Sequence, residues 1–323
     1  MKKKRVFLTR TLHDFALNEL KKRYQIEVHS GKIPIPKTKL RFKIQDMDGL
    51  ICFPYDKIDK EIIDAAKNLK VISTYSVGFD HIDTQYAKEK KIRIGHTPEV
   101  LTDATADLAF SLLIDILRRV SEGDRIIRCG RWQEIFGAYD YVGVDLQGKT
   151  LGILGLGRIG GTLAKRAKAF DMKIIYHNRK AVSKSKEKTL GAKYVTFEKL
   201  IKYSDIISIH VPHTTLTNQL FDMKIFKKMK KTAVLINTAR GKIINEKDLI
   251  VALDKKIIAG AALDVFESEP IGKNHPLTKI QNVVLAPHIG SSTKETREKM
   301  AMITVKNLNL GINGKTPVYS VGY

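Results

Sequence analysis

Short apolar runs alternate with amphipathic segments from residue 150 onward. Each run holds three to five residues, and successive runs begin roughly 20 to 30 residues apart. Runs of this kind are typical of strands that are buried on both faces of a parallel sheet and are connected by crossover helices. The pattern therefore predicts a doubly wound sheet with strands at residues 151–154, 174–176, 206–209, 234–236, 259–263 and 283–285.

The first hundred residues repeat the pattern more weakly. Apolar runs at residues 6–8, 48–51, 71–72 and 92–94 predict strands, and residues 61–67 predict a helix. A chain of 323 residues is also too long for one typical hydrophobic core. We therefore expect an α/β protein with two doubly wound parallel-sheet domains, a Rossmann-like domain and a smaller flavodoxin-like one.

Two helices are expected at the crossings between these domains. The first would be capped by Thr102 and carry apolar residues at helical spacing as far as Val120. The second would open at Ser292, where Ser-Thr-Lys-Glu forms a capping box, and run to about Leu310 before returning to the smaller domain. The predicted domains are residues 1–101 with 290–323, and residues 102–289.

Composition and charge limit the classes of function. The formal net charge of +23 could mark a nucleic-acid-binding protein, but the lysines are scattered and no nucleic-acid-binding motif accompanies them. No apolar stretch reaches the roughly 18 residues that a membrane-spanning helix needs. Cys52 and Cys129 show no CxxC spacing, which suits a reducing compartment. We expect a cytoplasmic protein with no nucleic-acid partner, no membrane partner and no metal site.

A glycine-rich turn follows the strand that ends at residue 154. It precedes a helix predicted at residues 162–170 and a strand at residues 173–176. In a dinucleotide-binding unit the first glycine permits a tight turn, the second lets the backbone approach the pyrophosphate, and the third allows close helix packing. An ordinary glycine turn is the alternative, but the strand–turn–helix context favours a dinucleotide site. The predicted cofactor residues here are Gly155, Leu156, Gly157, Arg158, Ile159 and Gly160.

The end of the next strand bears on the choice of cofactor. Proteins that prefer NAD carry an acidic residue there to bind the ribose hydroxyls. This chain has His177 followed by Asn178, Arg179 and Lys180. An amide followed by two cations suits the 2′-phosphate of NADP, although a basic surface loop is the alternative in a chain this basic. The sequence favours NADP over NAD.

Three candidate catalytic side chains each follow a predicted strand. Arg240 follows residues 234–236, Glu269 follows residues 259–263, and His288 follows residues 283–285. Ligands of open α/β sheets bind beyond the carboxyl ends of the strands. An arginine can bind a carboxylate, and a histidine beside a carboxylate can act as a general acid. Each residue alone has a structural explanation, but together they predict hydride transfer to a 2-oxo acid.

The motifs then identify a family. The chain resembles the D-isomer-specific 2-hydroxyacid dehydrogenases, especially the glyoxylate/hydroxypyruvate reductases, over nearly its whole length. The resemblance rests on residues 76–83, 96–110, 155–161, 237–241, 264–270 and 287–290.

The resemblance implies a role for each candidate. Arg240 would bind the carboxylate and carbonyl of a small 2-oxo acid, His288 would be the general acid, and Glu269 would orient and charge His288. Backbone groups of Val77 and Gly78 would bind the substrate carboxylate. The smaller domain would then be the substrate (catalytic) domain and the larger one the dinucleotide-binding Rossmann domain. Further cofactor contacts would come from Thr105, Val211, Pro212, Thr217, Thr238, Ala239, Arg240, Asp264, His288 and Gly290.

Other readings remain open at this stage. His210 and His213 are rival acids, which we expect beside the cofactor or in structural roles. Phosphoglycerate dehydrogenase is the alternative enzyme, and a dinucleotide-sensing transcriptional corepressor is the alternative outside enzymes. Related enzymes are homodimers, so the aromatic segment with Trp132, Phe136 and Tyr139 would face a second copy of the chain; packing within the chain is the alternative.

Overall fold

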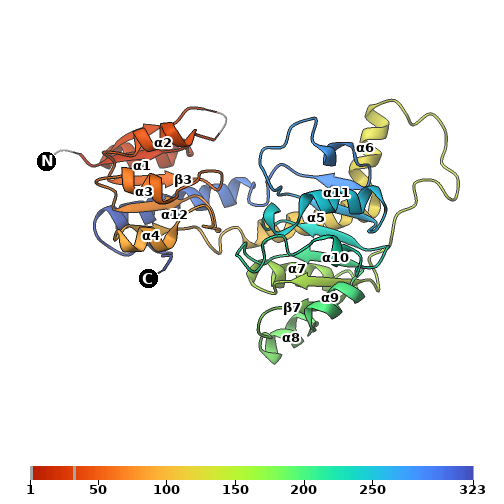
Figure 1. Ribbon diagram of the computed structural model, residues 1–323. Helices are drawn as coiled ribbons and strands as arrows, with labels where there is room; N and C mark the ends of the chain where they lie inside the picture. The colour runs from red at the N-terminus through yellow and green to blue at the C-terminus, as the bar shows by residue number, and fades with distance from the viewer. Residues whose placement is uncertain (1–2, 32–33, 323) are drawn as a thin grey trace. The chain divides into compact units, whose positions relative to one another are not determined.

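Two parallel sheets organise the chain in the computed structural model, which describes residues 3–31 and 34–322 (Figure 1). One sheet belongs to unit 1, formed by Met1–Leu101 and Ser291–Tyr323, and the other to unit 2, formed by Thr102–Gly290. The predicted fold class is confirmed. No helix of the described residues is long and apolar enough to cross a membrane.

Unit 1 has a five-stranded sheet with the strand order β2-β1-β3-β4-β5. This is the flavodoxin-like order, as predicted. Its strands are β1 (Arg5–Leu8), β2 (Gln25–Val28), β3 (Gly49–Cys52), β4 (Val71–Thr74) and β5 (Arg93–Gly95). Its helices are α1 (Asp14–Arg23), α2 (Lys37–Lys43), α3 (Lys60–Ala65), α4 (Thr84–Glu89) and α12 (Lys294–Ile312).

The last helix of the chain, α12, packs on β3, β4 and β5 of unit 1. The helix approaches closely at Gly311, where a Cβ atom would lie 2.4 Å from Cγ2 of Val71. Ser73 Oγ also donates a hydrogen bond of 2.9 Å to the carbonyl of Thr304. The return of this helix to the first unit confirms the sequence prediction.

The predicted start of α12 is wrong by one residue. Thr293, not Ser292, is the N-cap, and its hydroxyl accepts from the N–H of Thr296 at 3.2 Å. Ser292 Oγ instead accepts a 2.6 Å hydrogen bond from the guanidinium of Arg297. Two neighbouring hydroxyl residues can both serve as caps, so the motif fixed the start only to within one residue.

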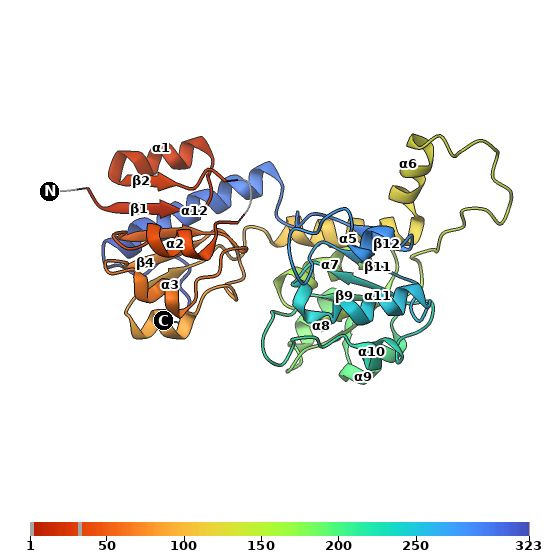
Figure 2. The same cartoon turned by 45° about the horizontal axis from the view of Figure 1, so that its top comes forward.

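Unit 2 has a seven-stranded sheet with the order β12-β11-β10-β9-β6-β7-β8 (Figure 2). This is the Rossmann order with a seventh strand at one edge. Its strands are β6 (Thr150–Leu154), β7 (Lys173–His177), β8 (Ala192–Tyr194), β9 (Ile206–Ile209), β10 (Val234–Asn237), β11 (Gly260–Leu263) and β12 (Val283–Leu285). Its helices are α5 (Thr102–Arg118), α6 (Val120–Arg128), α7 (Arg158–Lys168), α8 (Lys184–Leu190), α9 (Phe197–Tyr203), α10 (Met223–Phe226) and α11 (Glu246–Asp254), with 3-10 turns η1 (Gly241–Ile243) and η2 (Pro276–Lys279).

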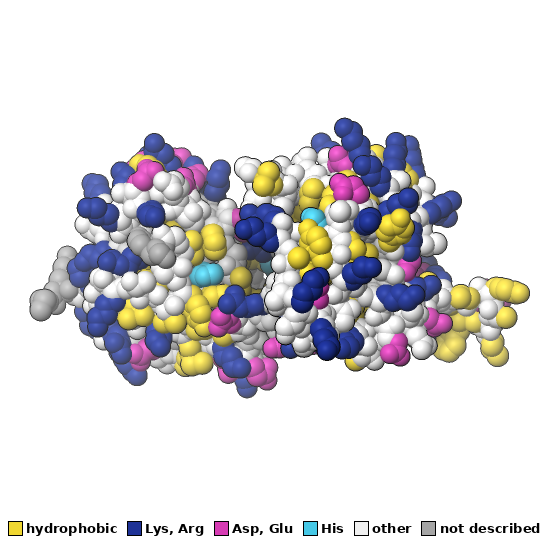
Figure 3. Space-filling view, turned by 90° about the horizontal axis from the view of Figure 1, so that it is seen from below, with side chains coloured by type: hydrophobic (Ala, Val, Ile, Leu, Met, Phe, Trp, Pro, Cys, Tyr) yellow, Lys and Arg dark blue, Asp and Glu magenta, His cyan; other side chains and the backbone are white. Residues whose placement is uncertain are grey.

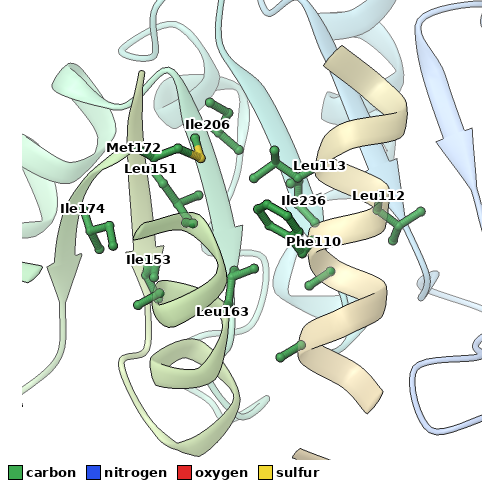
Figure 4. Packing of buried hydrophobic residues seen from close by; sticks show 14 of the residues in the cluster. Phe110, Leu112, Leu113, Leu151, Ile153, Leu163, Met172, Ile174, Ile206 and Ile236 are labelled. Atoms are coloured by element: carbon green, nitrogen blue, oxygen red, sulfur yellow. The ribbon is translucent and has the colours of Figure 1, made fainter. Parts of the chain in front are cut away.

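The central strands β6, β9, β10 and β11 of unit 2 are buried on both faces, as their continuous apolar runs predicted. Neighbouring residues of one strand enter different cores because side chains alternate across a sheet. Ile206 packs in the cluster that includes α5 and α7, whereas Ile207 packs in the cluster that includes α9 and α11. In Figure 4, Phe110 and Leu113 of α5 point toward the sheet.

Two helices of unit 2 begin or end away from their predicted positions. The helix that starts at Thr102 ends at Arg118, and Arg119 adopts a left-handed φ of 56°. Asp115 Oδ1 there accepts the N–H of Ser121 at 2.7 Å, which replaces a helical carbonyl partner. Val120 therefore lies in α6 and is 58% exposed rather than on a buried face. The helix after the glycine turn begins at Arg158, four residues earlier than predicted.

Candidate active site

His288 and Glu269 form a hydrogen-bonded pair in unit 2. Nδ1 of His288 lies 2.6 Å from Oε2 of Glu269, and both side chains are largely buried. A carboxylate oxygen accepts hydrogen bonds, so Nδ1 carries the proton of this bond. Nε2 is then the ring nitrogen that can exchange a proton with a ligand. The two residues follow β12 and β11, which are neighbours in the sheet.

Glu269 is itself held by the turn that precedes it. Its Oε1 accepts the N–H of Phe266 at 2.9 Å. The next residue of the turn, Glu267, donates its N–H to Oε2 of Glu246 at 3.2 Å. Because His288 binds the other oxygen of Glu269, the carboxylate is fixed through both of its oxygens.

Asp264 holds the turn that carries His288. Its two oxygens accept the N–H groups of Ile289 at 2.7 Å and of Gly290 at 2.8 Å. His288 has a left-handed φ of 55°, a conformation that costs a non-glycine residue about 1–3 kcal/mol. Burial raises the pKa of Asp264. Thr105 adds a 3.1 Å hydrogen bond to the carbonyl of Gly290, so two residues predicted to lie near the cofactor, Asp264 and Thr105, fix the histidine turn.

Arg240 lies in a second turn, directly after β10. The buried amide of Asn237 donates to the carbonyl of Arg240 at 2.9 Å and accepts the N–H of Ala239 at 3.0 Å. A Cβ atom on Gly241 would lie 1.9 Å from the carbonyl carbon of Phe266. The arginine turn and the Glu269 turn are therefore in direct backbone contact.

Asn237 is a residue of the site to which sequence reasoning gave no role. A buried amide at the last position of a strand, followed by a turn, was the available signal. Thr238, which follows it, has a buried hydroxyl without a hydrogen-bond partner within residues 3–31 and 34–322.

The glycine turn has the geometry expected of its three glycines. Gly155 has a φ of 100°, and a Cβ atom there would lie 2.8 Å from the carbonyl of His210. A Cβ atom on Gly160 would lie 2.3 Å from the carbonyl oxygen of Gly155. Among the described residues, none has an atom within 4 Å of a Cβ atom built on Gly157, the N-cap of α7. The backbone at Gly157 is therefore open to a ligand, and the helix N-terminus favours an anionic one.

Asn178 and Lys186 contact the middle of the glycine turn. Oδ1 of Asn178 accepts the N–H of Leu156 at 2.7 Å, and Nζ of Lys186 lies 3.5 Å from the carbonyl of Leu156. Arg179 and Lys180 are exposed. Lys186 comes from α8 and was not predicted, because its distance along the chain gave no signal of this contact.

A cavity of about 380 Å³ adjoins this turn. Its lining includes Gly157 and three cationic side chains, from Arg158, Lys165 and Lys186. The cavity therefore offers positive charge beside the exposed N-terminus of α7.

The two rival histidines lie after β9. His210 Nε2 is 2.8 Å from Ser208 Oγ, and burial lowers the pKa of His210 to about 4. A histidine that is neutral at pH 7 is poorly suited to donate a proton there. His213 is hydrogen-bonded to Asn218 at 3.0 Å in an exposed loop. That loop is stabilised by Thr217, whose hydroxyl donates to the carbonyl of Pro212 at 2.7 Å.

Comparison with known proteins decides the family. A model described as D-isomer specific 2-hydroxyacid dehydrogenase, NAD binding domain, matches residues 110–290. A glyoxylate reductase from Thermofilum pendens is 46% identical over 318 residues, covering 98% of this chain and 94% of the relative. The chain belongs to the D-isomer-specific 2-hydroxyacid dehydrogenase family.

Solved structures agree with this assignment. The TT0316 protein from Thermus thermophilus superposes on the dehydrogenase with a TM-score of 0.90 and 43% identity, covering 98% of this chain and 99% of that one. An NADPH-dependent glyoxylate/hydroxypyruvate reductase from Sinorhizobium meliloti was solved with NADP and malonate. It superposes on this chain with a TM-score of 0.86 and 29% identity, covering 99% of this chain and 97% of that one. The protein is an NAD(P)-dependent oxidoreductase that acts on 2-oxo or 2-hydroxy acids.

Proposed function

We propose that this dehydrogenase reduces glyoxylate or hydroxypyruvate with NADPH, and that hydroxypyruvate gives the D-2-hydroxy acid. The observation that carries the proposal is the His288–Glu269 pair, which follows strands of the same sheet as the glycine turn. The relatives from Thermofilum and Sinorhizobium, a glyoxylate reductase and a glyoxylate/hydroxypyruvate reductase, support the same substrates.

The proposed reduction divides between two side chains of unit 2. The guanidinium of Arg240 binds the carboxylate and the carbonyl oxygen of the substrate, because it is planar, always charged and presents several donors. His288 donates the proton on Nε2 to the carbonyl oxygen. NADPH, held at the glycine turn, would supply the hydride that the carbonyl carbon receives. Glu269 stabilises the positive charge of the imidazolium before this transfer. In the reverse direction the neutral ring accepts the proton from the 2-hydroxyl group.

We also propose that the N–H groups of Val77 and Gly78, in unit 1, bind a substrate carboxylate. Both residues follow β4 and are partly exposed. Among the residues that the structure describes, neither N–H group donates a hydrogen bond to another protein group.

The proposed preference for NADPH rests on the end of β7. This position has no carboxylate, since Asn178 occupies it and binds the glycine turn. Exposed Arg179 and Lys180 follow, and Lys186 lies against the same turn. Positive charge here would stabilise a 2′-phosphate, whereas a 2′-hydroxyl would gain little from it.

The remaining proposed cofactor residues act in two ways. Asp264, Thr105 and Thr217 have side chains that bind backbone groups of their own unit, so we assign them to shaping the cofactor site. The hydroxyl of Thr238 is buried without a protein partner among the described residues and could bind the cofactor directly. Backbone or side-chain contacts are proposed for Val211, Pro212, Ala239 and Gly290.

The proposed partner is a second copy of the chain. In Figure 1, α6 and the loop after it stand away from the sheet of unit 2. Phe136 stacks on Tyr141 at 5.0 Å, but Ile135 is 97% exposed and Tyr139 94%. Hydrophobic side chains gather on this loop, at the right-hand end of Figure 3, whereas basic side chains are spread over the visible face. An exposed apolar patch indicates a protein interface.

We place the protein in the cytoplasm and assign it no nucleic-acid partner. Its two cysteines are free thiols, and on the face shown in Figure 3 the basic side chains of the described residues are spread out rather than gathered in the single patch that nucleic-acid binding favours.

A substrate panel tests the proposed function. Glyoxylate, hydroxypyruvate, pyruvate and 3-phosphohydroxypyruvate would each be assayed with NADPH and with NADH. We expect glyoxylate or hydroxypyruvate with NADPH to give the highest kcat/KM. A higher value for 3-phosphohydroxypyruvate would favour the phosphoglycerate enzyme, a preference for NADH would overturn the cofactor assignment, and no turnover with any pair would overturn the enzymatic proposal.

A further inference from the structure

The turn at residues 76–79, after β4, is held by hydrogen bonds that use its carbonyl groups. Its N–H groups at Val77 and Gly78 are those assigned above to the substrate carboxylate, so the following inference rests on the proposed function. We infer that His96, His81 and Ser76 are positioning residues, which act on these N–H groups without contacting the substrate. His96 fixes the direction of the Gly78 N–H group, whereas Ser76 and His81 hold the peptide plane that follows Gly78 and so restrict rotation about this glycine.

Three consecutive carbonyl oxygens of the turn accept hydrogen bonds from its own unit. The carbonyl of Ser76 accepts the N–H of Thr97 at 2.8 Å. The carbonyl of Val77 accepts from Nδ1 of His96 at 2.9 Å, and the carbonyl of Gly78 accepts from Ser76 Oγ at 2.5 Å. Every peptide plane of the turn is therefore fixed through its oxygen.

The carbonyl contacts determine where the N–H groups point. A trans peptide unit is planar, so its N–H group points opposite to its carbonyl oxygen. The carbonyl of Ser76 therefore fixes the direction of the N–H group of Val77, and the carbonyl of Val77 fixes the direction of the N–H group of Gly78. Thr97 and His96 are adjacent in the chain, so both N–H groups are directed away from the segment after β5. Two successive N–H groups held in this way can bind one anion.

A chain of three side chains supports the carbonyl of Gly78. Because that carbonyl can only accept, Ser76 Oγ donates to it and accepts from Thr74 Oγ1 at 2.9 Å. The hydroxyl of Thr74 donates its only proton to Ser76, so it accepts the hydrogen bond from Nε2 of His81 at 3.0 Å. The order of donors therefore runs from His81 through Thr74 and Ser76 to the turn.

Cys52 offers a different reading of His81, which the geometry does not favour. Its Sγ lies 3.9 Å from Nε2 of His81, and a cysteine–histidine pair can form a nucleophile. Burial, however, raises the pKa of Cys52 well above its usual range and keeps the thiol protonated. The shorter contact to Thr74 defines the role of His81.

The ring of His96 is fixed from two further directions. Phe79 meets it edge-on with centroids 5.5 Å apart, and Tyr319 does so at 6.5 Å. The backbone carbonyl of His96 accepts from Nδ2 of the buried Asn307 at 2.9 Å. A histidine whose ring is held by Phe79 and Tyr319, and whose backbone is held by α12, can place its donor without losing side-chain entropy when substrate binds.

Ser76 and Ser73 provide a matched pair for the main test. Both are buried serines whose hydroxyls donate to a backbone carbonyl, but Ser73 bonds to Thr304 on α12. We expect Ser76→Ala to raise the KM for glyoxylate by about two- to twelvefold, which corresponds to the roughly 0.5–1.5 kcal/mol of a lost hydrogen bond. Ser73→Ala should lower the Tm and leave this KM unchanged. The kcat and the KM for NADPH should change little in either variant.

The histidine is tested by loss and rescue. His96→Leu should raise the KM for glyoxylate, whereas His96→Asn should restore it, since an asparagine amide can donate from nearly the same position as Nδ1. Equal KM values for Ser76→Ala and Ser73→Ala, or an unchanged KM in His96→Leu, would overturn the positioning roles while the wild-type protein remains an active reductase. A wild-type protein that reduces no 2-oxo acid would instead overturn the proposed function, and this inference with it.

Discussion

Nδ1 of His288 lies 2.6 Å from Oε2 of Glu269, across 19 positions of sequence. The two residues meet because β11 and β12 are parallel neighbours, so the segments after both strands emerge at the same edge of the sheet. The same edge carries Arg240, after β10. The Rossmann sheet thus brings to one edge the arginine and the histidine to which we assign substrate binding and proton donation, from segments that are distant in sequence.

The two hydrogen bonds that the Asp264 carboxylate accepts lead us to expect that Asp264→Asn loses both stability and activity. Asp264→Asn keeps one acceptor but presents an amide NH₂ to one of the N–H groups of Ile289 and Gly290. An unsatisfied buried N–H costs about 1–3 kcal/mol, and the left-handed turn at His288 loses its support. We expect a lower Tm and a lower kcat, measured by thermal unfolding and by steady-state turnover.

Asp205 provides the control for this variant. Its Oδ2 accepts the N–H of Thr150 at 2.8 Å, at the other end of the strands of the same unit. Asp205→Asn should lower the Tm without lowering kcat. If Asp264→Asn lost stability but kept full kcat, the turn would not be needed to place His288.

A substitution at Gly157 should weaken cofactor binding without lowering the stability of the fold. A Cβ atom there meets nothing within 4 Å, so Gly157→Ala should leave the Tm nearly unchanged. The added methyl group would still obstruct the approach of the pyrophosphate to the backbone. We expect a clearly higher Kd for NADPH by fluorescence titration. Gly272→Ala, also at an open glycine, should change neither quantity; an unaltered Kd in Gly157→Ala would refute the assigned role of this turn.

His210 predicts a pH dependence of stability. The pKa of His210 is about 4 in the folded protein and about 6.5 in the unfolded chain. Between these values the unfolded chain binds a proton that the folded protein does not, so the free energy of unfolding falls as the pH falls from about 6.5 toward about 4. Above about pH 6.5 the histidine contributes no slope.

Substitution isolates this contribution. His210→Gln removes the titrating group, so its Tm should decline less than that of the wild-type protein between pH 6.5 and pH 4. The measurement is a series of thermal unfolding curves across that range. Parallel Tm profiles for the two proteins would show that burial of His210 does not oppose its protonation.

The apolar loop after α6 predicts self-association. Ile135→Asp and Tyr139→Asp would each place a charge on a nearly fully exposed apolar position. Burying an unpaired charge in an interface is costly, so the variants should shift from dimer to monomer in sedimentation velocity. Phe42→Asp, at a 69% exposed position of unit 1, is the control and should not change the mass. A monomeric wild-type protein would contradict the proposed homodimer.

The central strands could be predicted from the sequence, but two edge strands could not. Strands such as β9 and β10 are buried along their whole length, and buried parallel strands are continuous apolar runs. The edge strands β2 and β8 are largely half-exposed, with polar residues such as Gln25 and Lys193 at outward positions. Their apolar signal was too weak to separate them from loops.

The residues of the candidate site also divide into some that the sequence could identify and others that it could not. Arg240, Glu269 and His288 could be selected because each comes directly after an apolar run and matches a family motif. Asn237 and Lys186 contact turns of unit 2, and His96 contacts the turn after β4 of unit 1. These contacts join separate segments, and no local pattern in the sequence specifies such contacts. The turn after β4 illustrates the limit, because its carbonyl groups bind side chains from the turn itself and from the segment after β5.

The most direct measurement is the rate of a single turnover of NADPH with glyoxylate, by stopped flow, in the wild-type protein and in His288→Ala. General acid catalysis typically contributes about 10² to 10⁴ in rate, so the variant should be slower on that scale while its Kd for NADPH stays unchanged. A His288→Ala rate close to that of the wild-type protein would contradict the account.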